Sequence, residues 1–220
     1  ITFSNESELK CIKPRAFIES SLTEITIPKN VECINNRTFS RCEKLTKVEF
    51  AEGSQLKSIK ESAFELTGIT KLNLPIHFNE FCDGWSCYAE FLYSVTIPPE
   101  NDNFKMLNDK IIIGKTNSYN DTYDAIYFVS RDIETVFIPS YIKHIKYEAF
   151  KNCNKIQKCE FEENSKLEII GKKAFMQSSI TKINIPESVK IIQSGAFRSA
   201  EIEEIFIPSQ ITEIYEDTFR

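Results

Sequence analysis

A repeat of 22 to 25 residues runs through most of the sequence and constrains the fold more than any other feature. It is marked by a phenylalanine preceded by alanine or threonine. These phenylalanines recur at intervals of 22 and 25 residues before the middle of the chain and of 25, 22 and 22 residues after it: Phe17, Phe39, Phe64, Phe150, Phe175, Phe197 and Phe219. Such a period indicates a solenoid, in which each unit stacks only on its neighbours.

Most units read Leu-x-x-Ile-x-Ile-Pro-x-x-Val-x-x-Ile-x-x-x-Ala-Phe, as in residues 22–39, and a second type replaces Ile-Pro by a longer connection, as in "FAEGSQL" (50–56) and "FEENSKL" (161–167). Ile25 and Ile27 flank the polar Thr26, and this alternation predicts a short strand with one buried face. Pro28 ends the strand because proline has no N–H group to donate to a neighbouring strand. One unit cannot enclose its own apolar face, so the units must stack to bury it.

The middle of the chain departs from the repeat. Residues 76–98 form a degenerate unit, and residues 99–132 form a β-hairpin excursion with strands on either side of a turn at Asn108-Asp109. We therefore expect one solenoid over residues 1–220, with about nine units and a β-meander built onto it.

The two ends of the chain lie inside repeats. The first residues, "ITF", read as part of a strand, and the last, "EDTFR", stop where the next strand should begin. Neither end carries a polar capping unit, which stacked repeats need for solubility. The sequence is therefore expected to be a segment of a longer protein; as a complete chain it is expected to associate end to end.

Charge and hydropathy argue against two classes of partner. The chain has 32 acidic and 27 basic residues and a net charge of −5. This charge opposes attraction to phosphate backbones and anionic membrane surfaces, so nucleic acid is not an expected partner. No apolar run approaches the roughly 20 residues that cross a bilayer, so no membrane span is expected in this segment.

The sequence contains no recognisable catalytic or cofactor motif. Six glycines leave little material for a phosphate-binding loop. Of the two histidines, His144 reads as a surface or interface residue in the turn after a strand. His77 lies five residues before Cys82, but the sequence offers no third group to orient a thiolate–imidazole pair. We expect no enzyme, no cofactor and no metal site.

The cysteines and the glycosylation motifs leave the cellular compartment open. The seven cysteines are an odd count. Cys82 and Cys87 are candidates for a local disulfide, with two reduced thiols as the alternative, and their spacing does not fit a zinc site. Cys11 and Cys33 occupy equivalent positions of neighbouring units, which permits a disulfide between them; small buried or half-buried apolar residues are the favoured interpretation. Three sequons are candidate glycosylation sites: Asn5, Asn36 and Asn120.

The repeat resembles the BspA-like leucine-rich repeat family. The match is carried by "LTEITIPKNVECINNRTFSRCEKL" (22–45) and "ITKINIPESVKIIQSGAF" (180–197), and it covers nearly the whole chain. The resemblance implies an α/β-type repeat solenoid with a parallel sheet of short strands on one face and an irregular or short helical convex side. It also implies a non-enzymatic surface or secreted protein that binds host-cell or extracellular-matrix proteins. An intracellular scaffold with the same fold is the alternative.

The outward-facing column of the predicted sheet contains the candidate binding residues. Phe137 and Phe206 are aromatic in a column that is otherwise polar, and Tyr93 lies in the adjoining column with Lys158 and Lys182. Exposed aromatic side chains in such a place mark recognition sites. We therefore hypothesise that these residues bind a protein ligand. The alternative is that they are scattered surface aromatics and that the excursion covers Phe137.

Overall fold

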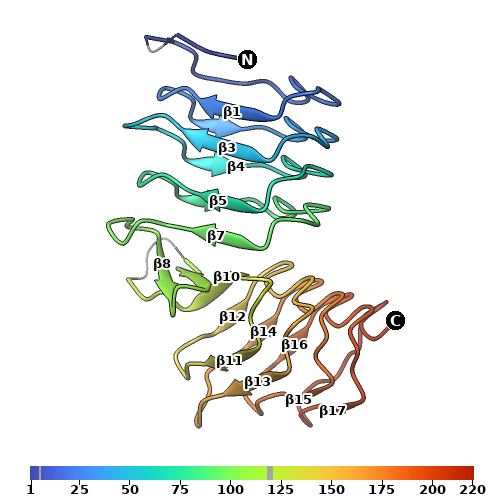
Figure 1. The fold of residues 1–220 in the computed structure, drawn as a ribbon. Coiled ribbons are helices and arrows are strands. Elements are labelled where there is room, and N and C mark those ends of the chain that lie inside the picture. The colour runs from blue at the N-terminus through green and yellow to red at the C-terminus, as the bar shows by residue number, and fades with distance from the viewer. Residues whose placement is uncertain (5, 118–120) are drawn as a thin grey trace. The chain divides into compact units, whose positions relative to one another are not determined.

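The computed structural model describes residues 1–4, 6–117 and 121–220 of the chain. It consists of two compact units, Ile1–Met106 and Leu107–Arg220, each built from short strands (Figure 1). The boundary lies inside strand β8 (Phe104–Leu107). The prediction of one solenoid over residues 1–220 concerns how the two units are placed relative to each other, and it stays a prediction.

The first unit has two rows of parallel strands. Strands β1 and β3 pair with each other, as do β5 and β7, and together they make the first row: β1 (Glu24–Ile27), β3 (Lys47–Phe50), β5 (Lys71–Asn73) and β7 (Ser94–Thr96). The second row is a three-stranded parallel sheet: β2 (Cys33–Ile34), β4 (Ser58–Ile59) and β6 (Glu80–Phe81). The three coils that begin with β1, β3 and β5 therefore each contribute one strand to each row.

The second unit repeats this arrangement and adds the excursion. Its first row contains the paired strands β11 and β13 and the paired strands β15 and β17: β11 (Thr135–Ile138), β13 (Lys158–Phe161), β15 (Lys182–Asn184) and β17 (Glu204–Phe206). The second row is parallel: β10 (Ala125–Val129), β12 (His144–Ile145), β14 (Ile169–Ile170) and β16 (Ile191–Ile192). The excursion strand β9 (Ile111–Gly114) pairs antiparallel with β10.

The expected α/β class with a short helical convex side is wrong. The described residues contain no helix, and both units are parallel β-solenoids. The convex turns hold two left-handed residues four positions apart, such as Arg37 (φ 55°) and Arg41 (φ 59°). An α-helix cannot pass through such residues. Their N–H groups donate instead to the next coil, from Arg37 to the Glu61 carbonyl at 3.1 Å and from Arg41 to the Glu65 carbonyl at 2.8 Å.

The repeated phenylalanines form stacked columns inside the convex turns. In the first unit Phe39 stacks between Phe17 and Phe64, with ring centroids 5.3 and 5.7 Å away. In the second unit Phe175 stacks between Phe150 and Phe197, at 4.5 and 5.2 Å. Because each ring covers its neighbours' faces, the column holds the coils in register and buries the apolar area that a single coil cannot enclose.

The degenerate unit keeps the coil with different core residues. Gly84 (φ 72°) and Tyr88 (φ 56°) are its two left-handed positions, and Ser86 stands where the other coils have phenylalanine. The indole of Trp85, one residue earlier, is buried and packs against Phe81 with a centroid separation of 4.8 Å. The buried indole thus adds apolar volume to the core of a coil that has no phenylalanine at its usual position.

Candidate functional site

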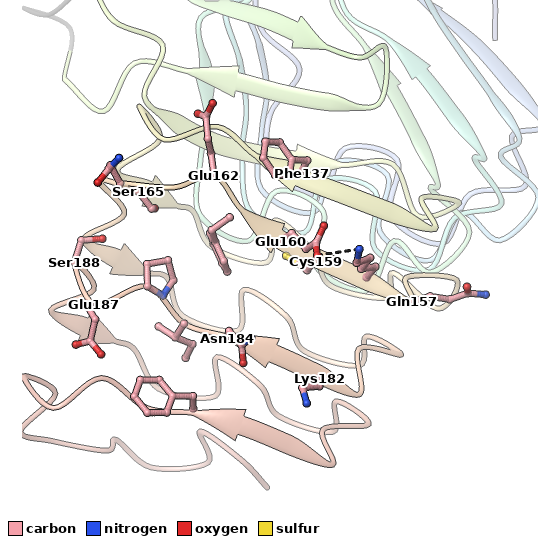
Figure 2. Close-up of a pocket in the computed structure, with 16 residues that line it drawn as sticks. Phe137, Gln157, Cys159, Glu160, Glu162, Ser165, Lys182, Asn184, Glu187 and Ser188 are labelled. Atoms are coloured by element: carbon pink, nitrogen blue, oxygen red, sulfur yellow. Dashed lines mark ion pairs between the residues drawn. The ribbon is translucent and has the colours of Figure 1, made fainter.

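A groove of about 860 Å³ lies on the outward face of the first row of strands in the second unit (Figure 2). Residues of four neighbouring strands line it: Phe137 on β11, Lys158 and Glu160 on β13, Lys182 and Asn184 on β15, and Phe206 on β17. The pleat explains this arrangement, since alternate side chains of a strand point to opposite faces. In register, Phe137 lies beside Glu160 and Asn184 beside Phe206.

Two exposed aromatic side chains stand at opposite ends of the groove. Phe137 is 53% exposed and Phe206 is 55% exposed. The excursion therefore does not cover Phe137. The lining between them includes the half-buried Phe161 and Pro186 and the buried Ile185 at the ends of β13 and β15. The groove thus has apolar material along its length and two aromatic residues at its ends, which is the composition of a recognition surface.

The charges of the groove are separated along the strands. At the start of β13, Lys158 pairs with Glu160 at 2.9 Å, and at the start of β15, Lys182 pairs with Glu204 of the next strand at 2.7 Å. At the other end of the strands, Glu162 accepts a hydrogen bond from the backbone N–H of Ser140 at 2.6 Å. This hydrogen bond lowers the pKa of Glu162, so its carboxyl group stays ionised below the usual range.

The structure brings together four of the five predicted binding residues. Phe137, Lys158, Lys182 and Phe206 line the same groove. Tyr93 lies in the first unit, directly before β7, and its side chain is 39% exposed. It is therefore not assigned to the groove, and a role for it in binding stays a prediction.

Cys82 has charged neighbours other than the histidine considered from the sequence. Burial raises the pKa of the Cys82 thiol, and a hydrogen bond with Lys60 offsets only part of this effect. Lys60 itself pairs with Glu80 at 2.8 Å. His77 is exposed. A thiol with a raised pKa beside Lys60 and Glu80 is not set up as a nucleophile activated by imidazole.

His144 belongs to strand β12 and not to the turn that the sequence predicts. It is half-buried, and burial lowers its pKa, with a further contribution from Lys146. The two-residue strands of the second row were not predicted from the sequence. They are too short to show an alternating pattern, because two residues do not make a repeat of two.

The remaining predicted sites stay predictions. All seven cysteines are thiols in the described structure, with Cys82 and Cys87 half-buried. Asn36 is exposed, whereas Asn5 and Asn120 lie outside the described residues. Over the same ranges, no group of three or more His, Cys, Asp or Glu side chains is arranged to hold a metal ion. A search of those residues also found no helix of the length and hydrophobicity that a membrane crossing requires.

Several groove residues were missed by sequence reasoning. They end or follow the strands: Phe161, Glu162, Ser165, Ile185, Pro186, Glu187 and Ser188. The repeat assigned Phe161 and Ile185 to the inward column and the next residues to variable loops. One signal for Phe161 was available. It aligns with Ile138 across β11 and β13, and its aromatic ring is larger than the isoleucine side chain that fills this inward position in the neighbouring coil.

Stacked coils with a parallel sheet and an exposed outward groove define a solenoid repeat protein whose extended surface binds ligands. Residues 2–112 and 122–220 match the BspA type leucine rich repeat region, in six copies. The chain belongs to this family, which confirms the resemblance seen in the sequence. It is therefore a repeat module for protein interaction. Comparison with curated proteins finds no match.

Solved structures with the same fold come from bacterial leucine-rich repeat proteins. The pneumococcal vaccine antigen PcpA is 21% identical, with a TM-score of 0.71 over 95% of this chain and 56% of PcpA. A leucine rich cell surface protein from Faecalibacterium prausnitzii is 20% identical, with a TM-score of 0.67 over 96% of this chain and 66% of that one. These identities establish a shared fold. The chain spans between about half and two thirds of each of these two proteins.

Proposed function

We propose that the chain is the binding part of a surface-displayed or secreted adhesin, and that the groove between Phe137 and Phe206 contacts a protein of a host cell or of the extracellular matrix. The observation that carries this proposal is the pair of exposed phenylalanines on one row of parallel strands. A stacked sheet presents them without a large loss of conformational freedom on binding, which favours affinity. The protein acts by complementarity of shape and side chains, without catalysis.

Two of the solved structures support the surface location by their names, one being a vaccine antigen and the other a cell surface protein. An intracellular scaffold with the same fold is the second candidate. In that case the seven cysteines would be reduced and the sequons unused.

Binding is tested with the purified chain on immobilised fibronectin, collagen and laminin and on cultured epithelial cells. We expect saturable binding to at least one of them. The double variant Phe137→Ala/Phe206→Ala should bind about 30-fold more weakly, because two hot-spot aromatics are lost. The matched control is Thr26→Ala/Thr96→Ala, in the outward column of the first unit. Equal affinity of the phenylalanine variant would exclude the groove, and no binding to any surface would exclude the adhesin.

The compartment is tested on the native protein. Treatment with peptide N-glycosidase followed by mass spectrometry shows whether Asn5, Asn36 or Asn120 carried a glycan, because a released site becomes aspartate. A count of accessible thiols in the denatured protein is made in parallel. Glycans or a Cys82–Cys87 bridge support the secreted adhesin. Bare asparagines with seven thiols support the scaffold.

A further inference from the structure

The groove has an uneven distribution of charge that bears on the kind of partner it accepts. Both of its lysines are already paired with carboxylates, Lys158 with Glu160 and Lys182 with Glu204. Glu162 and Glu187 lie on the loop side of the groove, after β13 and β15 (Figure 2). Within the described parts of the chain, no lysine or arginine forms an ion pair with either of them. The loop side of the groove is therefore an acidic edge.

The carboxylate of Glu162 is fixed in place and ionised, which suits it to bind a cation. One of its carboxylate oxygens, Oε2, accepts the Ser140 N–H at 2.6 Å, which fixes the group and keeps it ionised. A fixed carboxylate loses little conformational entropy when it forms a charge-assisted hydrogen bond with a lysine or arginine.

Apolar side chains lie beside the acidic edge. Phe161, Ile185 and Pro186 line the groove within one or two residues of Glu162 and Glu187. A lysine or arginine that reaches the edge would therefore lay its aliphatic stem on apolar surface and its charged end on carboxylate. The groove is in this respect suited to a long basic side chain rather than to an acidic one, which would meet two like charges.

The spacing of the strands determines how many residues of an extended ligand reach from one phenylalanine to the other. Phe137 and Phe206 are three strand intervals apart, about 14 Å at the usual spacing of neighbouring strands. An extended peptide that crosses these strands advances about 3.4 Å per residue, so about four residues span the distance. Side chains two residues apart then point to the same face, and two of them can enter the groove together.

We infer that the groove binds an extended segment of a partner protein that carries a lysine or arginine two residues from an apolar side chain. The apolar side chain packs against Phe137 or Phe206, and the basic one reaches Glu162 and Glu187. This inference rests on the proposed function, because it names the partner of the same groove. The net charge of −5 of the whole chain favours the approach of such a segment.

The inference is tested by selecting random dodecapeptides, displayed on phage, on the immobilised chain. Enriched peptides are then synthesised and titrated against the purified chain and its variants. We expect enrichment of lysine or arginine two positions from an apolar residue. The variant Glu162→Gln/Glu187→Gln should bind these peptides about tenfold more weakly and with less dependence on salt. Its matched control is Glu24→Gln/Glu49→Gln in the first unit, which should bind as the parent does.

The outcomes separate this inference from the proposed function. Peptides that lose affinity with Phe137→Ala/Phe206→Ala but not with Glu162→Gln/Glu187→Gln would overturn the basic ligand and leave the groove as a binding site. Enrichment of acidic peptides would have the same meaning. Failure to enrich any peptide, or affinity that neither pair of substitutions changes, would overturn both. All four substituted side chains are exposed, so thermal unfolding is expected to match the parent and serves as the folding control.

Discussion

Glu148 and Lys151 form a buried ion pair in the first convex turn of the second unit, with 3.0 Å between Oε1 and Nζ. Glu148 is 2% exposed and Lys151 is 6% exposed. Glu148 is also a left-handed residue (φ 54°), and its N–H donates to the Lys172 carbonyl of the next coil at 3.2 Å. The pair therefore sits at a point where two coils are joined.

Removing one charge of this pair should destabilise the fold strongly. The substitution Lys151→Met leaves the Glu148 carboxylate buried beside an apolar side chain, so we expect the free energy of unfolding to fall by about 3–5 kcal/mol. Urea unfolding followed by circular dichroism measures it. The control is Lys158→Met, which breaks an exposed pair and should cost less than about 1 kcal/mol. Equal effects of the two substitutions would contradict the structural role of the buried pair.

The sequence predicts the inward columns of the repeat well, because burial leaves a repeated pattern. Ile25, Ile27, Val31, Ile34 and Phe39 occupy the apolar positions of the repeat, and all are buried. Each column faces the same column in the coils above and below, so the physical requirement for an apolar residue recurs with every turn. The stacking of the coils could therefore be inferred before the structure was known.

The convex side could not be inferred in the same way. Its conformation is set by backbone dihedral angles at positions occupied by arginine, serine, glutamate, lysine and glycine, which share no side-chain property. The sequence thus gives no signal for the left-handed residues that exclude a helix. For a related reason, the sequence predicted only some of the groove residues. Phe137 and Phe206 were visible as aromatics in a polar column, whereas Glu162 and Glu187 became part of the site only through the path of the loops.

A buried asparagine joins the degenerate unit to the strand that follows it. Asn101 is 0% exposed. Its Nδ2 donates to the carbonyls of Ile76 and Phe78 at 2.8 and 2.7 Å, and its Oδ1 accepts the N–H groups of Asn103 and Phe104 at 2.9 and 2.8 Å. One amide therefore satisfies four backbone groups of two neighbouring chain segments.

Asn101→Ala should leave buried backbone groups without partners, each at a cost of about 1–3 kcal/mol. We expect a loss of at least about 3 kcal/mol in unfolding free energy, measured by urea titration. Asn73→Ala is the matched control, since Asn73 is exposed and accepts only the Thr96 hydroxyl at 2.7 Å. A loss as small as that of the control would mean that water replaces the amide.

Gly171 is required by the close approach of the preceding coil. A Cβ atom at this position would lie 2.5 Å from the Ile145 carbonyl oxygen and 3.0 Å from the Lys146 carbonyl carbon, and both are backbone atoms that cannot turn away. Gly171→Ala should therefore lower the unfolding free energy by about 1–3 kcal/mol. The comparison variant is Gly195→Ala. At Gly195 φ is 64°, and the atom nearest to an added Cβ, at 3.4 Å, belongs to a flexible lysine side chain.

Gly195→Ala isolates the cost of a left-handed alanine, about 1 kcal/mol. Thermal unfolding of both variants measures the difference. If Gly195→Ala proves the more costly of the two, the contact of Gly171 with Ile145 is not what selects glycine there.

Asp124 should make the second unit sensitive to acid. Burial raises the pKa of its carboxyl group, but hydrogen bonds from Thr116 and the neighbouring Lys143 outweigh this effect, so the pKa lies below its ordinary value of 3.8. The Thr116 N–H donates to Oδ1 at 2.9 Å, and Lys143 lies 3.3 Å from Oδ2. A depressed pKa means that the folded state binds its proton less readily than the unfolded state does. The resulting stabilisation is complete above pH 4 or so and disappears as the pH falls through the folded pKa.

Asp124→Asn should remove this dependence while keeping an oxygen to accept the Thr116 N–H. Unfolding free energies of the parent and the variant are compared by urea titration between pH 7 and pH 2.5. We expect the parent to be more stable at pH 7, by about 1 kcal/mol, and the difference to shrink as the pH falls below 4 or so. Other carboxylates titrate in both proteins, so the difference between the two curves isolates Asp124. A difference that stays constant down to the lowest pH would show that the carboxylate is not held in its charged form by Thr116 and Lys143.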